Sequence, residues 1–423
     1  TNTLKAYLAK DQLGNYLIPT VRQRPVLLMG PPGVGKTQIM EQIAAETGVG
    51  LVAYTITHHT RQSAIGLPFI EKRTYGGEEV SVTEYTMSEI LSSVYRLMER
   101  TGLQEGILFL DEINCVSETL APMMLQFLQC KTFGNQALPE GWLIVAAGNP
   151  PEYNKSVRDF DVVTLDRVKR IDVEEDYGVW KEYARRKNLH GAIRSYLDIK
   201  KDNFYRIENT ADGLQFATAR GWENLSELLY AYETLGIRAD REVVGQYIQM
   251  PRIAKDFANY LEMFYKYQKT YHVEGILSGT WENITVLELR EAPFDEKLSV
   301  MGLVLSRLSE EARNTRCQDA LTDALHTSLT EFREKIADAP PLTVLDQLLW
   351  KRRTAMKQAK EAGQLDKESR DLKQREINAL EDYRQQLDRE AVGPEGAMDA
   401  VRGGFGEEVE RRKAVAMETK DMF

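Results

Sequence analysis

The chain has 423 residues, more than one hydrophobic core usually supports, so two or more domains are expected. It carries 54 Lys and Arg against 64 Asp and Glu, a formal net charge of −10, which argues against a protein that coats nucleic acid by charge alone. Hydrophobic residues make up 43% and charged residues 28%, a globular balance that excludes wholesale disorder.

The sequence favours a cytoplasmic protein. The longest apolar stretches, such as residues 143–147, are far shorter than the roughly 20 residues of a membrane span, so no span is expected. The start, TNTLKAYLAK, lacks a signal-peptide core and an initiator Met, so we expect a processed start and no secretion. Cys115, Cys130 and Cys317 have no metal-site spacing, and we expect each to be buried as a small hydrophobic residue in a reducing compartment.

Residues 25–173 alternate short apolar runs with helical patterns. The runs include PVLLMG, LVAYTIT, ILFLDE and WLIVAAGN, which are apolar enough to be strands buried on both faces. This alternation predicts an α/β fold, an αβα core around a largely parallel sheet. Two stretches interrupt it and predict inserted β-hairpins: FIEKRTYGGEEVSVTEYT, turning at Gly76-Gly77, and CKTFGNQALPEGW, with Gly134-Asn135.

Three other regions show helical patterns. Residues 1–24 predict an N-terminal helical segment, residues 174–270 an all-helical second domain, and residues 271–340 a helical connecting region. In the last of these, the predicted apolar stripe is Leu298, Met301, Leu305 and Leu308.

Pro340-Pro341 interrupts the helical pattern, and residues 341–423 are densely charged. They predict a helical hairpin around Gly363 and then a flexible, glycine-rich tail over residues 393–406. Two interpretations remain open for the hairpin: a solvated pair that packs on the second domain, or a partner-docking arm. The predicted apolar seam is Leu345, Leu349, Met356 and Ala359, then Ile377, Leu380, Tyr383 and Leu387.

Residues 30–37 read GPPGVGKT and match GxxxxGK[ST] between a predicted strand and a predicted helix. Glycines let backbone N–H groups turn toward phosphate oxygens, and the following helix presents its positive end to the same anion. Lys36 should reach the β- and γ-phosphates of ATP, and the Thr37 hydroxyl should coordinate Mg²⁺. The predicted nucleotide-binding residues are Gly30, Pro32, Gly33, Val34, Gly35, Lys36, Thr37 and Gln38.

Polar side chains follow two further predicted strands. The run ILFLDE ends in two carboxylates, of which Asp111 should hold Mg²⁺, directly or through water, and Glu112 should polarise the attacking water. Asn149 follows the strand over residues 142–148. Ligands of such sheets bind beyond the carboxyl ends of the strands, so Asn149 should hydrogen-bond the γ-phosphate or the water.

This series of motifs resembles the AAA+ ATPases, and among them most closely the MoxR-like branch, a helix-2-insert clade. The resemblance covers roughly residues 20 to 270 and rests on GPPGVGKT, ILFLDEIN with Asn114, AAGNP, and TLDR at residues 164–167. The two predicted hairpins lie where that branch carries its helix-2 insert and its pre-sensor-1 hairpin. The resemblance implies ATP and Mg²⁺ as cofactors, a helical lid, and a homo-oligomeric ring, most simply a hexamer.

It also implies roles for single residues. Asn149 corresponds to sensor 1 and Arg220 to the sensor 2 arginine, although the family's Ser-Pro-Arg is Thr-Ala-Arg here. One of Arg158, Arg167 and Arg170 would be the arginine finger that adds positive charge to a neighbouring subunit's site; Arg167 is favoured, with a structural role as its alternative. The predicted catalytic residues are then Glu112, Lys36, Asn149, Arg167 and Arg220.

The chain departs from the family in two places. The acidic residue usual after the second strand is replaced by His58-His59-Thr60-Arg61, which we interpret as a solvated or pore-facing loop because no metal spacing surrounds it. The chain beyond about residue 271 has no counterpart in a minimal member of the branch.

Three functions share these motifs. The first is a chaperone-like remodeller that activates or assembles a protein partner, for which the resemblance implies a client or adaptor with a von Willebrand factor A domain. The second is a nucleic-acid motor, which is less favoured because Lys72, Arg73 and Lys131 stand near acids and no basic-aromatic stripe appears. The third is a nucleotide-gated scaffold that hydrolyses ATP poorly.

Overall fold

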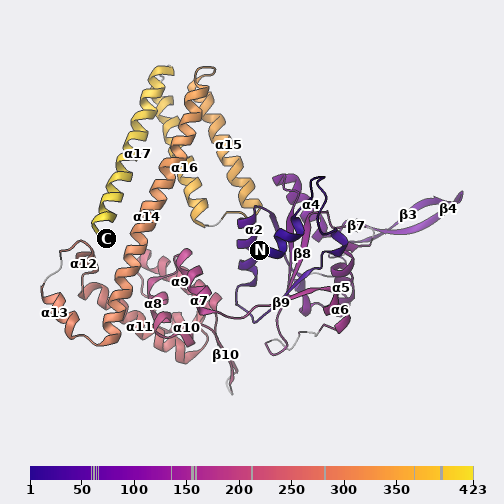
Figure 1. The fold of residues 1–423 in the computed structure, drawn as a ribbon, viewed down its shortest axis with the longest axis horizontal. Helices are drawn as coiled ribbons and strands as arrows, with labels where there is room; N and C mark the ends of the chain where they lie inside the picture. Colours follow the sequence, from indigo (N-terminus) through magenta and orange to yellow (C-terminus); the bar gives the residue numbers. More distant parts are fainter. Residues whose placement is uncertain are drawn as a thin grey trace. The chain divides into compact units, whose positions relative to one another are not determined.

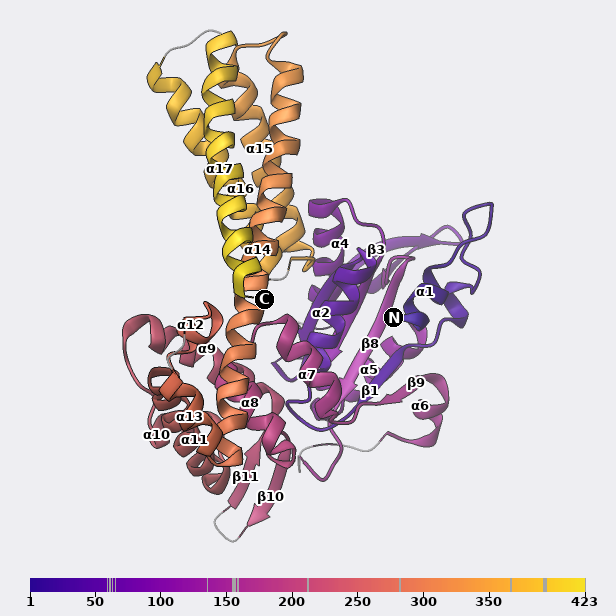
Figure 2. The same ribbon diagram turned by 60° about the vertical axis from the view of Figure 1, so that its left-hand side comes forward.

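The computed structural model describes the chain except residues 59, 61, 63, 65, 135, 154–156, 158–159, 211–212, 281–282, 366, 391–393 and 423. The chain divides into two compact units. The first comprises residues 1–175 with 355–366, and the second comprises residues 176–354 with 367–423. Figures 1 and 2 show the chain in two views.

A five-stranded parallel sheet forms the centre of the first unit. Residues within each strand alternate between its two faces: Ile107 and Phe109 belong to one hydrophobic cluster, and Leu108 and Leu110 to another. The predicted α/β fold is therefore confirmed, and β5 and β8 are buried on both faces as expected. The expectation is wrong for β2, which is partly exposed because it lies at the edge of the sheet, and the other edge strand, β9, is exposed along its length. The strands lie in the order β2 (Gly50–Thr55), β5 (Gly106–Asp111), β8 (Trp142–Gly148), β1 (Val26–Met29) and β9 (Lys169–Asp172).

Helices cover both faces of this sheet. Those of one face are α1 (Asn2–Leu8) and α2 (Lys36–Thr47), and those of the other are α4 (Glu89–Thr101) and α5 (Ala121–Cys130). The expected N-terminal helical segment is only partly helical, because α1 is followed by a bridge between Lys10 and Tyr16 and a short 3-10 turn, Thr20–Arg22.

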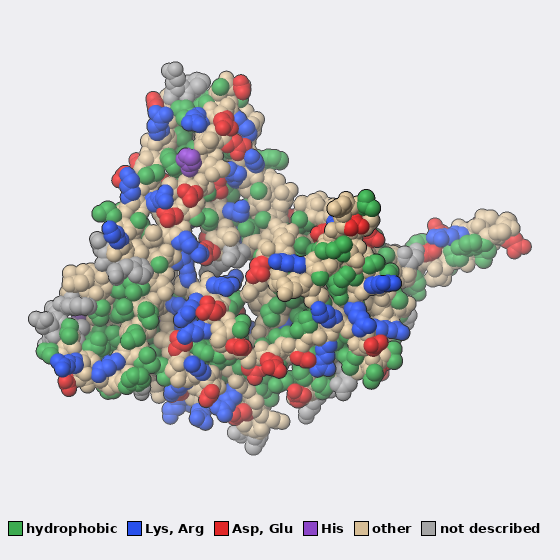
Figure 3. All heavy atoms as spheres, in the orientation of Figure 1, with side chains coloured by type: hydrophobic (Ala, Val, Ile, Leu, Met, Phe, Trp, Pro, Cys, Tyr) green, Lys and Arg blue, Asp and Glu red, His purple; other side chains and the backbone are tan. Residues whose placement is uncertain are grey.

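Both predicted hairpins are present. The long one joins β3 (Pro68–Tyr75) to β4 (Glu78–Tyr85) through two glycines in the left-handed region, and the short one joins β6 (Thr132–Phe133) to β7 (Gln136–Ala137). The long hairpin extends away from the sheet in Figure 1, and Figure 3 shows hydrophobic and charged side chains along it. Ile70 on β3 is 76% exposed, so this hairpin presents apolar surface to its surroundings.

The second unit begins with helices that enclose an aromatic core. Tyr196, Trp222 and Phe257 are almost fully buried and contact one another. The expectation of an all-helical domain is wrong, because β10 (Arg206–Thr210) and β11 (Gly213–Ala217) form an antiparallel hairpin. The helices are α7 (Tyr177–Arg186), α8 (Gly191–Ile199), α9 (Ala219–Leu235), α10 (Arg241–Tyr247) and α11 (Pro251–Thr270), with a 3-10 turn at Lys201–Asn203.

The connecting region holds α12 (Val273–Leu277), α13 (Asn283–Glu291) and the 42-residue α14 (Phe294–Lys335). The predicted apolar stripe on α14 is wrong in part, since Met301 and Leu305 are 57% and 56% exposed. The buried face instead carries Val300 and Leu303, which join the core of the second unit.

The second half of α14 runs beside three more helices, α15 (Pro341–Glu361), α16 (Lys367–Glu390) and α17 (Pro394–Met422) (Figure 2). Six residues of the predicted seam are buried: Leu345, Leu349, Ile377, Leu380, Tyr383 and Leu387.

The expected flexible tail is wrong, because α17 continues through its glycines. Gly404 lies where α17 meets α16: a Cβ at this position would come within 2.5 Å of the Tyr383 ring. The glycine composition therefore reflects a close helix contact rather than a flexible chain.

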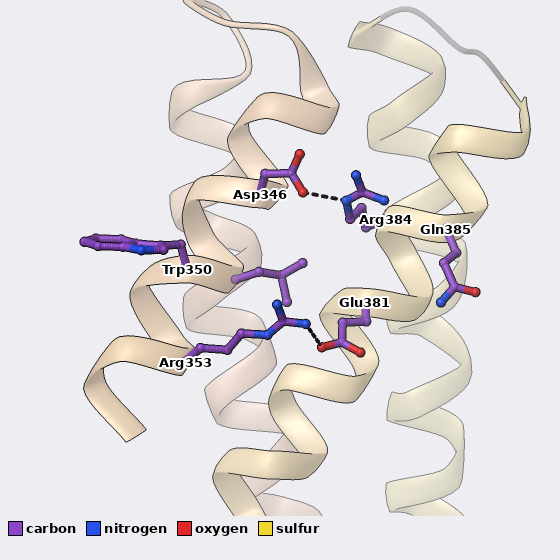
Figure 4. Close-up of a pocket in the computed structure, with 7 residues that line it drawn as sticks. Asp346, Trp350, Arg353, Glu381, Arg384 and Gln385 are labelled. Carbon is purple, nitrogen blue, oxygen red and sulfur yellow. Dashed lines mark hydrogen bonds and ion pairs between the residues drawn. The ribbon is translucent and has the colours of Figure 1, made fainter. Parts of the chain in front are cut away.

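A notch of about 400 Å³ lies between α15 and α16 (Figure 4). Ion pairs of Asp346 with Arg384 and of Arg353 with Glu381 cross it. Trp350 beside it is 70% exposed and points away from α16. Whether this hairpin docks a partner stays a prediction.

The three cysteines are free thiols, and the expectation that they are buried is wrong. Cys130 is exposed, and Cys115 and Cys317 are half-buried. Among the helices that the structure describes, none combines the length and the apolar character needed to cross a membrane.

Candidate nucleotide site

The glycine-rich loop runs from the end of β1 to the first turn of α2. Gly35 precedes α2 with φ of 97°, in the left-handed region that glycine tolerates best. A Cβ on Gly30 would lie 2.3 Å from the carbonyl oxygen of Val173, so only glycine fits there without a shift of the chain. Along the loop and first turn, Pro32, Gly33, Val34, Thr37 and Gln38 are half-buried.

Lys36 is 8% exposed, and its ammonium is held by oxygen atoms of the loop and of the next strand. Its Nζ donates to the carbonyls of Gly30 and Pro31 at 2.8 and 3.0 Å. It also donates to Oδ1 of Asn149 at 2.8 Å. The phosphate loop and Asn149 thus meet at one ammonium, and the role of Asn149 as sensor 1 stays a prediction.

The order of the strands explains this meeting. β8 lies between β1 and β5, so the residue after β8 stands between the phosphate loop and the acidic end of β5. Asn114, 3% exposed, fixes the backbone there: its Nδ2 donates to the Asn149 carbonyl at 2.8 Å, and its Oδ1 accepts from the Asn149 N–H at 3.3 Å. Asn114 therefore orients Asn149 through its main chain.

Two side chains that carry oxygen, those of Thr37 and Asp111, meet next to Lys36. The Thr37 hydroxyl donates to Oδ2 of Asp111 at 3.3 Å, while Oδ1 of Asp111 accepts from the Glu112 N–H at 2.9 Å. Hydroxyl and carboxylate oxygens are the ligands that Mg²⁺ prefers. These residues therefore fit ATP with Mg²⁺. The Lys36 ammonium and the glycine-rich loop suit the phosphates, and the oxygens of Thr37 and Asp111 suit the metal ion.

Glu112 has φ of 58°, an uncommon conformation for a residue with a side chain. Its carboxylate Oε2 accepts a hydrogen bond of 3.0 Å from the Thr57 hydroxyl. Thr57 follows β2, the strand next to β5, and belongs to none of the motifs visible in the sequence. A polar residue just after a predicted strand was the available signal, but using it requires knowing which strands are neighbours.

Two of the candidate finger arginines, Arg167 and Arg170, lie on elements other than those of this cluster. Arg167 ends α6 (Val162–Arg167), is exposed, and donates to the Gln129 side chain. Arg170 on β9 pairs with Asp172 at 2.8 Å. Arg158 lies outside the described residues, as do His59 and Arg61 of the loop after β2. The identity of the finger stays a prediction.

Arg220 belongs to the second unit, where it is exposed in the first turn of α9. The Thr218 hydroxyl caps this helix by accepting from the Gly221 N–H at 3.2 Å. A capping threonine thus starts the helix at the place where the family has serine and proline. The role of Arg220 at the phosphates stays a prediction.

Comparison with known proteins adds one finding. Residues 25–168 match the family described as the AAA domain of the dynein-related subfamily, and these residues contain four of the five sheet strands together with Lys36, Asp111, Glu112 and Asn149. No curated protein matches the chain. The match, the parallel sheet and the helical C-terminal region together fit an AAA+ fold, and they support an AAA+ ATPase.

Proposed function

We propose that the chain is a ring-forming AAA+ ATPase of the MoxR-like branch, which hydrolyses ATP to ADP and phosphate to remodel, activate or assemble a protein partner. The observation that carries the ATPase proposal is the convergence of Lys36, Asn149, Thr37 and Asp111 at one edge of the sheet, through hydrogen bonds of 2.8 and 3.3 Å. Fixed donors and acceptors of this kind stabilise a transferring phosphoryl group without reorganising.

Each side chain then has a defined task. The loop N–H groups and Lys36 would bind the phosphates, and Thr37 with Asp111 would hold Mg²⁺, which neutralises phosphate charge. Glu112 would orient and polarise the attacking water. Thr57 positions the Glu112 carboxylate through its hydroxyl, and Asn114 positions Asn149.

A ring follows if one arginine acts on the neighbouring subunit. Arg167 is exposed at the end of α6, a position from which a second copy can be reached. A head-to-tail contact of this kind closes into a ring or opens into a spiral. We propose a hexamer, on the resemblance to the family.

A protein partner is favoured over nucleic acid by the ion pairs of the long hairpin. Lys72 pairs with Glu79 at 3.1 Å, and Arg73 pairs with Glu71 and Glu84 at 2.9 and 3.0 Å. Cations already neutralised by carboxylates contribute little to phosphate binding. The exposed apolar residues of the same hairpin instead suit a protein surface, and a von Willebrand factor A domain is the partner that the resemblance suggests.

Glu112→Gln tests the ATPase proposal. This variant should bind ATP as tightly as the unchanged chain and lose at least about a hundredfold in turnover, because the base is lost and the Mg²⁺ ligand Asp111 is kept. Unchanged turnover in the variant would refute the role of Glu112.

A mixing experiment tests the arginine finger. Arg167→Ala subunits mixed with Glu112→Gln subunits should recover part of the turnover, because an intact Arg167 then faces an intact Glu112 at some interfaces. Arg170→Ala is the matched control on the neighbouring strand β9. Recovery with Arg170→Ala instead of Arg167→Ala would reassign the finger.

A further inference from the structure

A groove of about 730 Å³ lies in the second unit, within the size range of ligand sites. Five of its lining side chains are cationic and two are carboxylates, which leaves three net positive charges in a chain whose net charge is −10. The charged side chains follow α8, lie in the next 3-10 turn, start β10 or lie in the first half of α11: Lys200, Lys201, Asp202, Arg206, Arg252, Lys255 and Asp256.

One carboxylate that lines this basic groove, Asp256, is already neutralised. Asp256 accepts two hydrogen bonds from Lys200, at 2.6 and 2.7 Å, and one from the Tyr196 hydroxyl at 2.7 Å. Burial, together with the hydrogen bond to Asp256, raises the pKa of Tyr196, so its hydroxyl stays a donor at neutral pH. Asn203 donates to the same hydroxyl at 2.7 Å. The charge of Asp256 is therefore balanced within this hydrogen-bond network.

The other cations that line the groove have different surroundings. Arg252 and Lys255 lie on α11 at a spacing that brings them to one face together with Asn259, and all three are exposed. Within the part of the chain that the structure describes, Lys201, Arg252 and Lys255 form no ion pair, whereas Arg206 pairs with Glu208 at 2.7 Å. Cations gathered without carboxylates repel one another, and an anionic ligand would remove that repulsion.

We propose that this groove binds an acidic segment of a protein partner. The Arg252 guanidinium can take a carboxylate through two parallel hydrogen bonds, and Lys201 and Lys255 can take others as point charges. The Asn259 amide offers both a donor and an acceptor to a peptide backbone.

The lining disfavours a nucleic-acid strand. No aromatic residue lines the groove among the described residues, so unstacked bases would find no platform there. The carboxylate of Asp202 would oppose closely spaced phosphates, while a peptide can place its own carboxylates between the cations. The proposal concerns binding alone and does not depend on ATP hydrolysis.

The test measures binding of a short fluorescein-labelled peptide of alternating glutamate and glycine to the full chain, by fluorescence anisotropy without nucleotide. The glutamine version of the peptide is the ligand control. The groove variant is Arg252→Glu with Lys255→Glu, and the matched control is Lys266→Glu with Lys269→Glu, which makes the same charge change on exposed residues of the same helix. Arg252→Gln with Lys255→Gln is used if the reversal lowers the unfolding temperature.

We expect the glutamate peptide to bind more tightly than the glutamine peptide, and the groove variant to weaken its binding at least about tenfold while the matched control changes it less than about twofold. Equal losses in both variants would overturn the proposal, because binding would then follow overall charge. Equal binding of the two peptides by the unchanged chain would also overturn it. Tighter binding of an oligothymidylate, lost in the groove variant only, would replace the peptide with a nucleic-acid ligand.

Discussion

Gly148→Ala is expected to destabilise the first unit only while Asn114 is present. A Cβ at residue 148 would lie 2.7, 2.9 and 3.1 Å from Oδ1, Cγ and Nδ2 of Asn114, and these are its nearest neighbours. Overpacking of this degree costs about 1–3 kcal/mol. The backbone of Gly148 does not have positive φ, so the methyl group itself causes no backbone strain.

Asn114→Ala should also destabilise the unit, for a different reason. It removes two hydrogen bonds to the backbone of Asn149, each worth about 0.5–1.5 kcal/mol net, for a total of about 1–3 kcal/mol. It also removes the atoms with which a methyl group on residue 148 would collide. The double variant should therefore cost at least about 1 kcal/mol less than the sum of the two single variants.

Hydrogen exchange of peptides covering β8 is the suitable assay, because it reports the opening free energy of this strand rather than of the whole chain. ATP turnover should separate the two effects. Turnover falls in Asn114→Ala and stays low in the double variant, since the alanine at residue 148 restores packing but does not hold the Asn149 backbone. Asn114→Asp is a further control, because it keeps the acceptor for the Asn149 N–H and loses the donor.

Additive opening free energies, within about 0.5 kcal/mol, would refute the reasoning. They would mean that Gly148 and Asn114 do not compete for the same space. Recovery of turnover in the double variant would refute the positioning role of Asn114.

Three further predictions concern other parts of the chain. Lys36→Ala should weaken ATP binding at least about tenfold, as measured by calorimetry, because the ammonium between the loop and Asn149 is lost. Burial lowers the pKa of Lys131 from 10.5 to about 8. Between these pH values the folded chain binds fewer protons than the unfolded chain, so the free energy of unfolding should rise with pH by about 1–2 kcal/mol, after allowance for the partial exposure of the side chain. Urea unfolding at successive pH values should show this rise in the unchanged chain and not in Lys131→Met. Gly404→Ala should destabilise the chain by about 1–3 kcal/mol, because the new methyl group collides with the Tyr383 ring. Gly403→Ala, whose Cβ would lie in open space, should instead stabilise α17 by about 0.5–1 kcal/mol. If both variants raise the temperature of thermal unfolding, the packing of α17 described above is contradicted.

The phosphate loop was predictable because its chemistry is local. Its glycines, Lys36 and Thr37 lie within eight residues, and a strand before and a helix after them are enough to place them. The same holds for Asp111 and Glu112 at the end of an apolar run. Asn149 required only the rule that ligands gather at the carboxyl ends of parallel strands.

Features that depend on which elements become neighbours were missed. Thr57 bonds Glu112 only because β2 lies next to β5, and nothing in the residues after β2 states that order. The buried face of α14 was misplaced because this helix contacts one set of helices through Val300 and Leu303 and another set farther along. A glycine-rich composition suggested a flexible chain at α17, although its glycine at residue 404 serves a close contact.

One missed element did leave a local signal. β11 begins at Gly213, and the sequence Asp-Gly at residues 212–213 is of a kind typical of tight turns between strands. The helical patterns on either side of it outweighed that signal in the sequence analysis.

The length of α14 has a mechanical consequence. Its 42 residues correspond to about 63 Å of continuous helix, with one end in the aromatic core of the second unit and the other beside α15, α16 and α17. Such a helix can act as a lever arm: a rotation of about 10° at Leu303 would move the far end, about 48 Å away, by about 8 Å. Small movements of α8 and α11, which contact α14 and share a core with α9, would thus become larger displacements of the C-terminal helices.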